Sequence, residues 1–165
     1  MNKGTLNYKN YINLVENKLI KSPRLNINQI QPSSIDLTLS EECYEISASF
    51  LAHKNKVKDR LNQFVKKNIS LENGFVLKKG TTYLIKLNEK LFLKNNLFGK
   101  CNPKSSTGRL DIFCRTILDN SNEYEKIPLK YKGEMFIEIT CKSFDIKFYE
   151  GDALNQMRLV FNKNI

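Results

Sequence analysis

The sequence contains no tryptophan, one histidine and four cysteines, and these shortages exclude several kinds of site. Because His53 is the only histidine, a Ser-His-Asp triad around any other histidine and a metal site built from several histidines are excluded. No C-x-x-C pair occurs, and no cysteine–histidine cluster has the spacing of zinc ligands. We therefore predict no zinc site and a surface-loop position for His53. We expect four reduced, buried cysteines: Cys43, Cys101, Cys114 and Cys141.

Long apolar runs are also missing. No segment approaches the roughly 20 consecutive apolar residues that a membrane-spanning helix needs. Residues 1–4 lack the apolar stretch of a secretory signal peptide, so we expect a cytoplasmic protein with no membrane partner. The 165 residues suit one domain with a single sizeable core. No repeat or linker divides them, and we predict one domain over residues 1–165.

Positive charge exceeds negative charge by ten, with 27 lysines and arginines against 17 aspartates and glutamates. Such a balance suggests a polyanionic partner. The lysines are nevertheless spread along the chain, and its richness in Lys, Asn and Ile is typical of an AT-rich genome. We favour scattered surface lysines over a nucleic-acid-binding stripe and expect no nucleic-acid partner. A triphosphate ligand would need only a few of these charges.

Hydrophobic periodicity predicts a mostly β protein with two helices. Residues 8–20 have apolar side chains at helical spacing, and Pro23 is expected to end that helix. Residues 53–67 indicate a short surface helix. Many short strands with turns about every ten residues indicate a sandwich or barrel. The expected strands span 34–39, 74–77, 82–87, 91–93, 97–100, 112–118, 134–141, 144–148 and 154–161, with an irregular connection over 120–132.

A polar turn at Pro103–Leu110 combines hydroxyls, cations and a glycine. Lys104 and Arg109 supply charged donors, Ser105 and Ser106 supply hydroxyls, and Gly108 permits close approach of the backbone. The pattern is a plausible phosphate cradle, although it is not a P-loop because G-x-x-x-x-G-K-[ST] is absent. A turn that only reverses the chain is an equal alternative.

Period-two alternation over Gly133–Cys141 places Glu138 in the middle of a strand. Glu134, Phe136, Glu138 and Thr140 share one face of that strand. A carboxyl group held there and covered by a subunit or a ligand would lose solvent and suit a general acid/base. The alternative is an exposed glutamate on a solvated face. Further along, Asn155 and Gln156 follow a turn at Gly151 and could bond a base, sugar or phosphate.

Four segments in this order resemble the dUTPase and dCTP deaminase superfamily over nearly the whole chain. Gln31–Leu39 is similar to the first motif, where an S-x-D-L-x-L strand lies near the start. Pro103–Leu110 resembles the R-S-S-x-x-R-L turn, with Lys104 in place of the leading arginine. Thr116–Asp119 resembles the strand that ends in aspartate, and Gly151–Leu159 resembles the late G-D-x-x-x-Q strand. Within this superfamily, Asn102–Asp111 and an added segment near Ser47–Leu61 resemble the first half of longer, two-domain dCTP deaminases.

The resemblance implies a distorted dUTPase-like β-barrel (β-clip) with an N-terminal helix and a short inserted helix. It further implies a homotrimer or larger homo-oligomer with active sites between subunits. The expected activity is zinc-independent deamination of dCTP, with Mg²⁺ bound through the substrate triphosphate. In this family pattern Glu138 is the acid/base, Ser105 places the water and Arg109 supports the site. The implied nucleotide-binding residues are Lys104, Ser106, Thr107, Gly108, Asp119, Phe136, Ile137 and Gln156.

Several alternatives stay open at this point. A dUTPase uses the aspartate of the third motif, matched by Asp119, but normally has no acid at the position of Glu138, which favours deamination. A bifunctional enzyme converting dCTP to dUMP, or a non-catalytic half-domain that assembles with a catalytic partner, also fits. The connection between Asp119 and Gly133 is longer than is usual in the family, so whether Asp119 contacts the sugar of the nucleotide stays open. Inhibition by dTTP is another open point, and we expect no C-terminal arm after the last strand.

Overall fold

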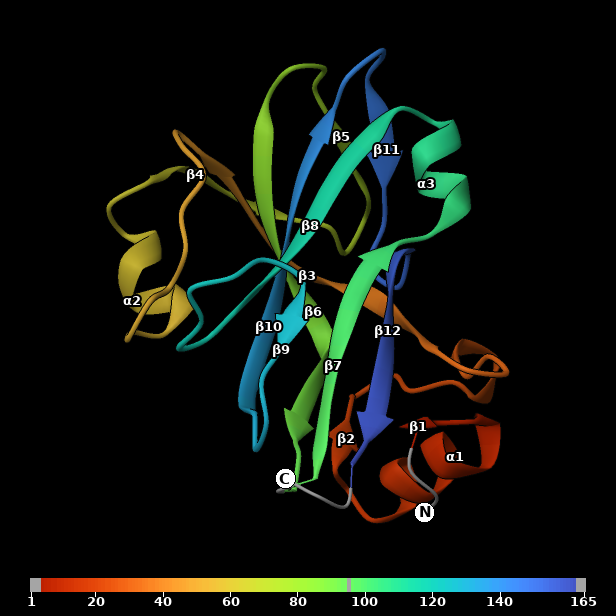
Figure 1. Cartoon of the computed structure of the whole chain (residues 1–165). Helices are drawn as coiled ribbons and strands as arrows, with labels where there is room; N and C mark the ends of the chain where they lie inside the picture. Colours follow the sequence, from red (N-terminus) through yellow and green to blue (C-terminus); the bar gives the residue numbers. More distant parts are fainter. Residues whose placement is uncertain (1–3, 95, 163–165) are drawn as a thin grey trace.

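The computed structural model describes residues 4–94 and 96–162 and shows a β-barrel with short helices at its margins (Figure 1). The residues after Asn162, on which the expected lack of a C-terminal arm depends, lie outside the described part. The elements are β1 Gly4–Thr5, α1 Tyr8–Glu16, β2 Ile20–Lys21, the 3₁₀ turn η1 Ile27–Gln29, β3 Ile35–Ile46, α2 Val57–Leu61, β4 Val65–Ser70, β5 Phe75–Leu77, β6 Thr82–Phe92, β7 Leu97–Pro103, α3 Ser105–Arg109, β8 Ile112–Leu118, β9 Lys126–Ile127, β10 Lys132–Cys141, β11 Ile146–Phe148 and β12 Ala153–Phe161.

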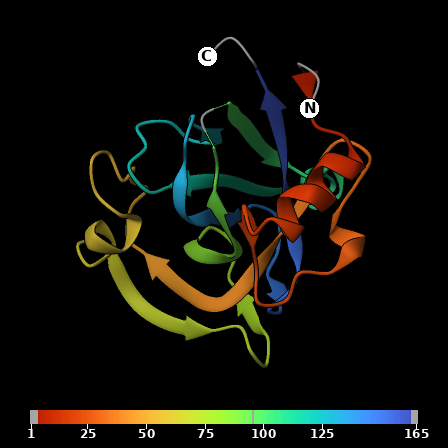
Figure 2. The ribbon, with the colours of Figure 1, turned by 90° about the horizontal axis from the view of Figure 1, so that it is seen from below.

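One antiparallel sheet forms the barrel. Within the described residues its main path runs β8-β10-β6-β3-β12-β7-β9, and β1, β2 and β4 pair with β12, β6 and β3. Strand β8, at one end of this path, also approaches β7, β9 and β12, so the sheet curls until it nearly closes (Figure 2). A small second sheet pairs β5 with β11. The predicted fold class, a distorted and mostly β barrel with an N-terminal and an inserted helix, is confirmed.

Glu125 closes the barrel at the edge of β8 that faces away from β10. Its backbone N–H donates to the Thr116 carbonyl on β8 at 3.0 Å, and its carbonyl accepts from the Cys101 N–H on β7 at 2.7 Å. Its Oε1 accepts from the Thr116 N–H at 2.7 Å and from Nδ2 of Asn155, on β12, at 3.3 Å. One residue thus bonds three strands, in a left-handed backbone conformation with φ 64°.

Two hydrophobic clusters use the two faces of the barrel wall. The alternation predicted for β10 is confirmed, because Met135, Ile137 and Ile139 point into the main core inside the barrel. Phe136, on the opposite face, belongs to a second cluster outside the wall. There the segment between β3 and β4 folds back and buries Phe50, Ala52, Val57 and Leu61 against Leu84, Ile117 and Phe136.

Several helices and strands end at residues other than those predicted, because pairing with distant strands decides their ends. The N-terminal helix ends at Glu16, and Lys18 adopts φ 57°, so Pro23 does not end it as predicted. Ile20 instead pairs with Leu91 of β6. The inserted helix is only Val57–Leu61, the strands expected at 82–87 and 91–93 are one strand, β6, and the connection over 120–132 contains β9.

Candidate active site

Glu138 lies in the middle of β10, between Leu84 of β6 and Arg115 of β8. The residue is only 1% exposed, so the prediction of a carboxyl group removed from solvent is confirmed. Its Oε1 accepts a hydrogen bond from Nε of Arg115 at 3.0 Å. Its Oε2 is buried and has no hydrogen-bond partner among the described residues. An unpaired buried oxygen of this kind costs free energy and therefore calls for an explanation.

The cover over the Glu138 face comes from the chain itself. We expected a neighbouring subunit or a ligand to exclude solvent there. Instead, the inserted segment packs its second hydrophobic cluster onto this face of β6, β8 and β10. Arg115 and Tyr124 complete the cover, with the guanidinium 3.7 Å from the centre of the Tyr124 ring. The side chain of Arg115 is 27% exposed and that of Glu138 is 2% exposed, so Arg115 is the member of the pair that reaches solvent.

Arg115 and Tyr124 are parts of this site that the sequence analysis missed. A signal for Arg115 was present, because it is the one charged residue of the strand Ile112–Leu118. In an antiparallel ladder a lone mid-strand cation can meet an anion directly across, here Glu138. Tyr124 had no such signal, because it belongs to the irregular connection whose path depends on the closure by Glu125.

The turn at Pro103–Leu110 is a short helix, α3, and not a plain turn. Ser105, Ser106, Gly108 and Arg109 are exposed. Thr107 is buried, and its hydroxyl donates to the Leu154 carbonyl at 2.7 Å, which anchors the helix on β12. The four exposed residues can therefore meet a ligand or another subunit, while Thr107 holds them in place.

Residues from three of the four motif segments meet beside α3. Nζ of Lys104 forms an ion pair with Oδ2 of Asp36 on β3. Gln156 on β12 pairs in register with both Asp36 and Asn102, and its Oε1 accepts from the hydroxyl of Ser34 at 3.1 Å. The structure thus brings the predicted Lys104 and Gln156 onto one surface with the exposed hydroxyls of α3.

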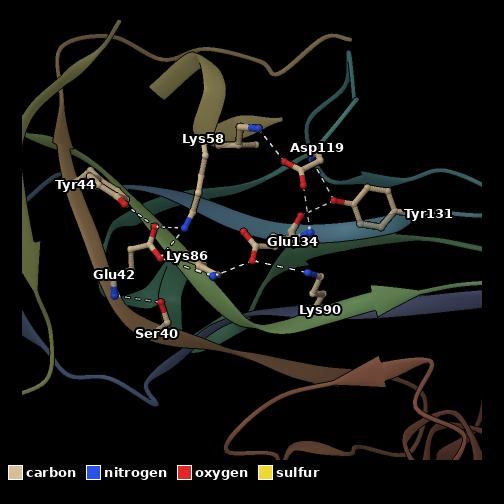
Figure 3. A network of polar contacts seen from close by, with 10 residues as sticks. Ser40, Glu42, Tyr44, Lys58, Lys86, Lys90, Asp119, Tyr131 and Glu134 are labelled. Atoms are coloured by element: carbon tan, nitrogen blue, oxygen red, sulfur yellow. Dashed lines mark hydrogen bonds and ion pairs between the residues drawn. The ribbon is translucent and has the colours of Figure 1, made fainter. Parts of the chain in front are cut away.

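Asp119 belongs to a different polar network. Its Oδ1 accepts from the backbone N–H of Val57, the first residue of α2, at 2.8 Å (Figure 3). Its Oδ2 accepts from the N–H of Glu134 at 3.3 Å. Tyr131 joins them, because its hydroxyl accepts from the Asp119 N–H at 3.1 Å and donates to the Glu134 carbonyl. Asp119 therefore fastens the inserted segment to the start of β10.

A cationic cavity of about 490 Å³ lies beside this network. Its wall includes Asp119 together with Lys56, Lys90 and Lys132. In Figure 3, Lys90 reaches Glu134 from one side, and Lys58 of α2 turns towards Glu42 on the other. Four lysines and three carboxylates line it in all, because Lys58, Asp59 and Glu134 also belong to the wall. The small excess of ammonium groups can accept an anionic ligand with hydroxyl groups.

The predicted residues therefore fall into separate groups within one chain. Across the described residues, no hydrogen bond or ion pair joins Glu138 to residues 104–109. Phe136 and Ile137, predicted to contact nucleotide, have fully buried side chains in the outer cluster and the barrel core. His53 lies exposed on a loop, with Nδ1 2.9 Å from Oδ1 of Asn122, and the four cysteines are free and buried, as predicted.

The described residues hold neither a cluster of metal ligands nor a membrane-spanning helix. Within 4–94 and 96–162, no three or more histidine, cysteine, aspartate or glutamate side chains gather so that they could hold a metal ion. In the same ranges, no helix is long and apolar enough to cross a membrane.

Comparisons with known proteins agree on one family. The model of the 2'-deoxycytidine 5'-triphosphate deaminase (DCD) N-terminal domain matches residues 2–163. A Persephonella marina protein named "dCTP deaminase, dUMP-forming" is 29% identical over 161 residues, which cover 96% of this chain and 83% of that protein. The crystal structure of 2'-deoxycytidine 5'-triphosphate deaminase from Agrobacterium tumefaciens matches with a TM-score of 0.94 and 37% identity. That match covers 98% of this chain and 49% of the other, so the chain spans about half the length of the Agrobacterium protein.

Proposed function

Because the chain belongs to the family of 2'-deoxycytidine 5'-triphosphate deaminase N-terminal domains, we propose that it hydrolyses dCTP to dUTP and ammonia. The observation that carries this proposal is the carboxyl group of Glu138. It is buried, it is held by one oxygen, and its other oxygen has no partner among the described residues. A carboxylate in this state can take a proton from water at the moment of attack.

The proposed reaction adds water to C4 of the cytosine ring. Glu138 takes a proton from the water as its oxygen bonds to C4, and it delivers that proton to N3. It then takes the proton of the new C4 hydroxyl, which becomes the carbonyl, and delivers it to the leaving amine. The C4–N4 bond then breaks, and dCTP plus water become dUTP plus ammonia. A positioned acid/base of this kind typically contributes about 10²–10⁴-fold to the rate.

Ser105 and Arg109 have proposed roles that require a second copy of the chain. Both are exposed on α3, and in one chain neither is bonded to Glu138 within the described residues. We propose that α3 of one subunit faces Glu138 of its neighbour, in a homotrimer or a larger homo-oligomer. There Ser105 would hold the attacking water, and Arg109 would support the site and its ligand.

The triphosphate would bind on the surface where the motif segments meet. Lys104 and Ser106 would donate to phosphate oxygens, the Gly108 backbone would allow close approach, and Gln156 would contact the nucleotide. Mg²⁺ typically binds substrate phosphates with few protein ligands, which fits a chain whose described part has no acidic ligand cluster. The ion would therefore enter with the cytoplasmic nucleotide.

A second candidate activity is the conversion of dCTP to dUMP. The name of the Persephonella relative, "dCTP deaminase, dUMP-forming", favours it. In this route a second water would also attack the α-phosphorus, the bond between the α- and β-phosphates would break, and pyrophosphate would leave. Asp119, the residue matched to the acid of dUTPases, is bonded through both oxygens to backbone N–H groups, so it would have to release at least one of them.

The test is a product assay on the purified protein with Mg²⁺, using dCTP and dUTP in separate reactions. Deamination predicts ammonia and dUTP from dCTP, with no product from dUTP. The bifunctional route predicts pyrophosphate and dUMP from dCTP. No ammonia from dCTP, even when the protein is oligomeric, would refute the proposal and leave a nucleotide-binding half-domain.

A further inference from the structure

Arg115 has a defined relationship to the proposed acid/base. The two residues are directly opposite on adjacent antiparallel strands, so the backbone itself sets their spacing. The bond from Nε of Arg115 goes to Oε1 of Glu138 alone, at 3.0 Å. A bidentate pair would occupy both carboxylate oxygens, whereas this arrangement leaves Oε2 without a partner among residues 4–94 and 96–162.

Aromatic rings hold the guanidinium group in that position. It lies 3.7 Å from the centre of the Tyr124 ring, which is close stacking, and 5.3 Å from that of Phe113. Stacking on an aromatic face restrains a guanidinium because the ring quadrupole attracts the cation. Tyr124 is itself held in place, because the next residue, Glu125, bonds β7, β8 and β12.

We propose that Arg115, seated on Tyr124, is a positioning residue that holds Oε1 of Glu138 and so presents Oε2 to the reacting water and pyrimidine. This inference rests on the proposed deamination. Because Arg115 is the partly exposed member of the pair, it also separates Glu138 from solvent. Arg115 therefore acts on the reaction through Glu138, without touching the substrate.

A purely structural ion pair is the competing explanation, since a buried carboxylate needs a cation whatever its role. The two explanations predict different outcomes when Arg115 is shortened. A structural pair predicts lower stability with normal turnover by the molecules that remain folded. A positioning residue predicts lower turnover in fully folded protein, with substrate binding unchanged.

The experiment measures kcat and KM for dCTP in Arg115→Lys and Arg115→Ala, with the folded fraction checked by circular dichroism. Arg115→Lys keeps the charge that Glu138 needs but loses the planar stacking and the fixed Nε donor, so it is the variant that should fold. We expect kcat to fall about 10²-fold, the loss that misplacement of a reacting group by about 1 Å can cause, with KM unchanged. Arg24→Ala is the matched control, because it removes another arginine–glutamate pair, with Glu150 at 2.9 Å.

Chemical rescue separates positioning from packing. Added methylguanidinium should restore at least about a tenth of the lost kcat in Arg115→Ala, and none in Glu138→Gln. If Arg115→Ala does not fold, kcat and KM of folded Arg115→Lys carry the test. Wild-type kcat in folded Arg115→Lys, or a higher KM with normal kcat, would overturn the positioning role of Arg115 but would leave the proposed deamination standing. A wild-type protein that releases no ammonia would refute deamination itself, and the positioning role with it.

The Tyr124 ring gives an independent check. Tyr124→Phe keeps the aromatic face under Arg115 and should keep kcat within a fewfold of wild type. Tyr124→Leu removes that face and should lower kcat in the same direction as Arg115→Lys. Equal losses in both variants would contradict the stacking role, because they would point to the phenol hydroxyl.

Discussion

Lys104 and Asp36 form an ion pair that joins the segment before α3 to strand β3. Asp36 lies beside Gln156 of β12 in the sheet register, so the pair sets the ammonium group next to a carboxamide and the exposed hydroxyls of α3. The side chain of Lys104 is 30% exposed. Its remaining N–H groups can therefore bond a phosphate while the carboxylate keeps it in place.

Lys104→Met should weaken the binding of dCTP. A hydrogen bond to a charged group contributes roughly 1.5–3 kcal/mol, so we expect KM to rise about 10- to 100-fold while kcat changes little. Initial-rate kinetics at two salt concentrations measure this, and Lys54→Met, on an exposed loop, is the control. An unchanged KM would show that the phosphates bind elsewhere, for example at the cationic cavity beside Asp119.

Glu138→Gln should abolish ammonia release while nucleotide still binds. The amide cannot accept the proton of the attacking water, and we expect kcat to fall about 10²–10⁴-fold. Calorimetry with dCTP and an ammonia assay together check both halves of the prediction. Glu150→Gln, which alters the ion pair with the exposed Arg24, serves as the control. Activity within a fewfold of wild type in Glu138→Gln would remove this residue from the mechanism.

Glu125 should make the free energy of unfolding depend on pH, and this dependence should be absent when glutamine, which does not titrate, replaces it. Burial raises the pKa of this carboxyl group above its ordinary value, and the bonds from Thr116 and Asn155 only partly oppose the rise. An acid with a raised pKa in the folded state gives most stability below its unfolded pKa, and that contribution is lost as pH rises through the folded pKa.

Glu125→Gln should therefore become more stable relative to wild type as pH rises from about 4.5 towards neutrality. Urea unfolding of both proteins at several pH values gives the difference directly. The comparison cancels the carboxyl groups that behave oppositely, such as Glu42, whose pKa is lowered by the bond from Lys58 despite its burial. A constant difference across this pH range would contradict the assignment.

The four cysteines should not react with thiol reagents in the folded protein. All are buried, and burial raises the pKa of Cys43 and of Cys114 to about 12, so the reactive thiolate is scarce at pH 8. Titration with a chromogenic disulfide should find no fast thiol in native protein and four in denaturant. A fast-reacting thiol in the native protein would mean that part of the barrel opens readily.

Sequence periodicity predicted the strands well where one face meets the core. Strand Ile112–Leu118 has the expected bounds, and the alternation of β10 placed Glu138 on the face opposite Ile137. The superfamily pattern also singled out Lys104 and Gln156, which the fold brings onto one surface. The strand predictions succeeded because period-two burial is a local property of the chain.

The features that were missed depend on contacts between distant segments. No local pattern shows that Ile20 pairs with Leu91, or that the inserted segment covers the face of Glu138. The stacking of Arg115 on Tyr124 depends on the path of an irregular connection. Such contacts are selected by the closed barrel as a whole, so propensity and periodicity could not predict them.

The closure by Glu125 has a consequence for the way molecules of this protein meet one another. The free edge of a strand offers unpaired N–H and C=O groups on which a strand of another molecule can add. Glu125 occupies those groups at Thr116, and it can reach them only because the connection from β8 to β10 is long. We therefore expect a deletion in that connection to expose the edge of β8 at Thr116 and to favour aggregation.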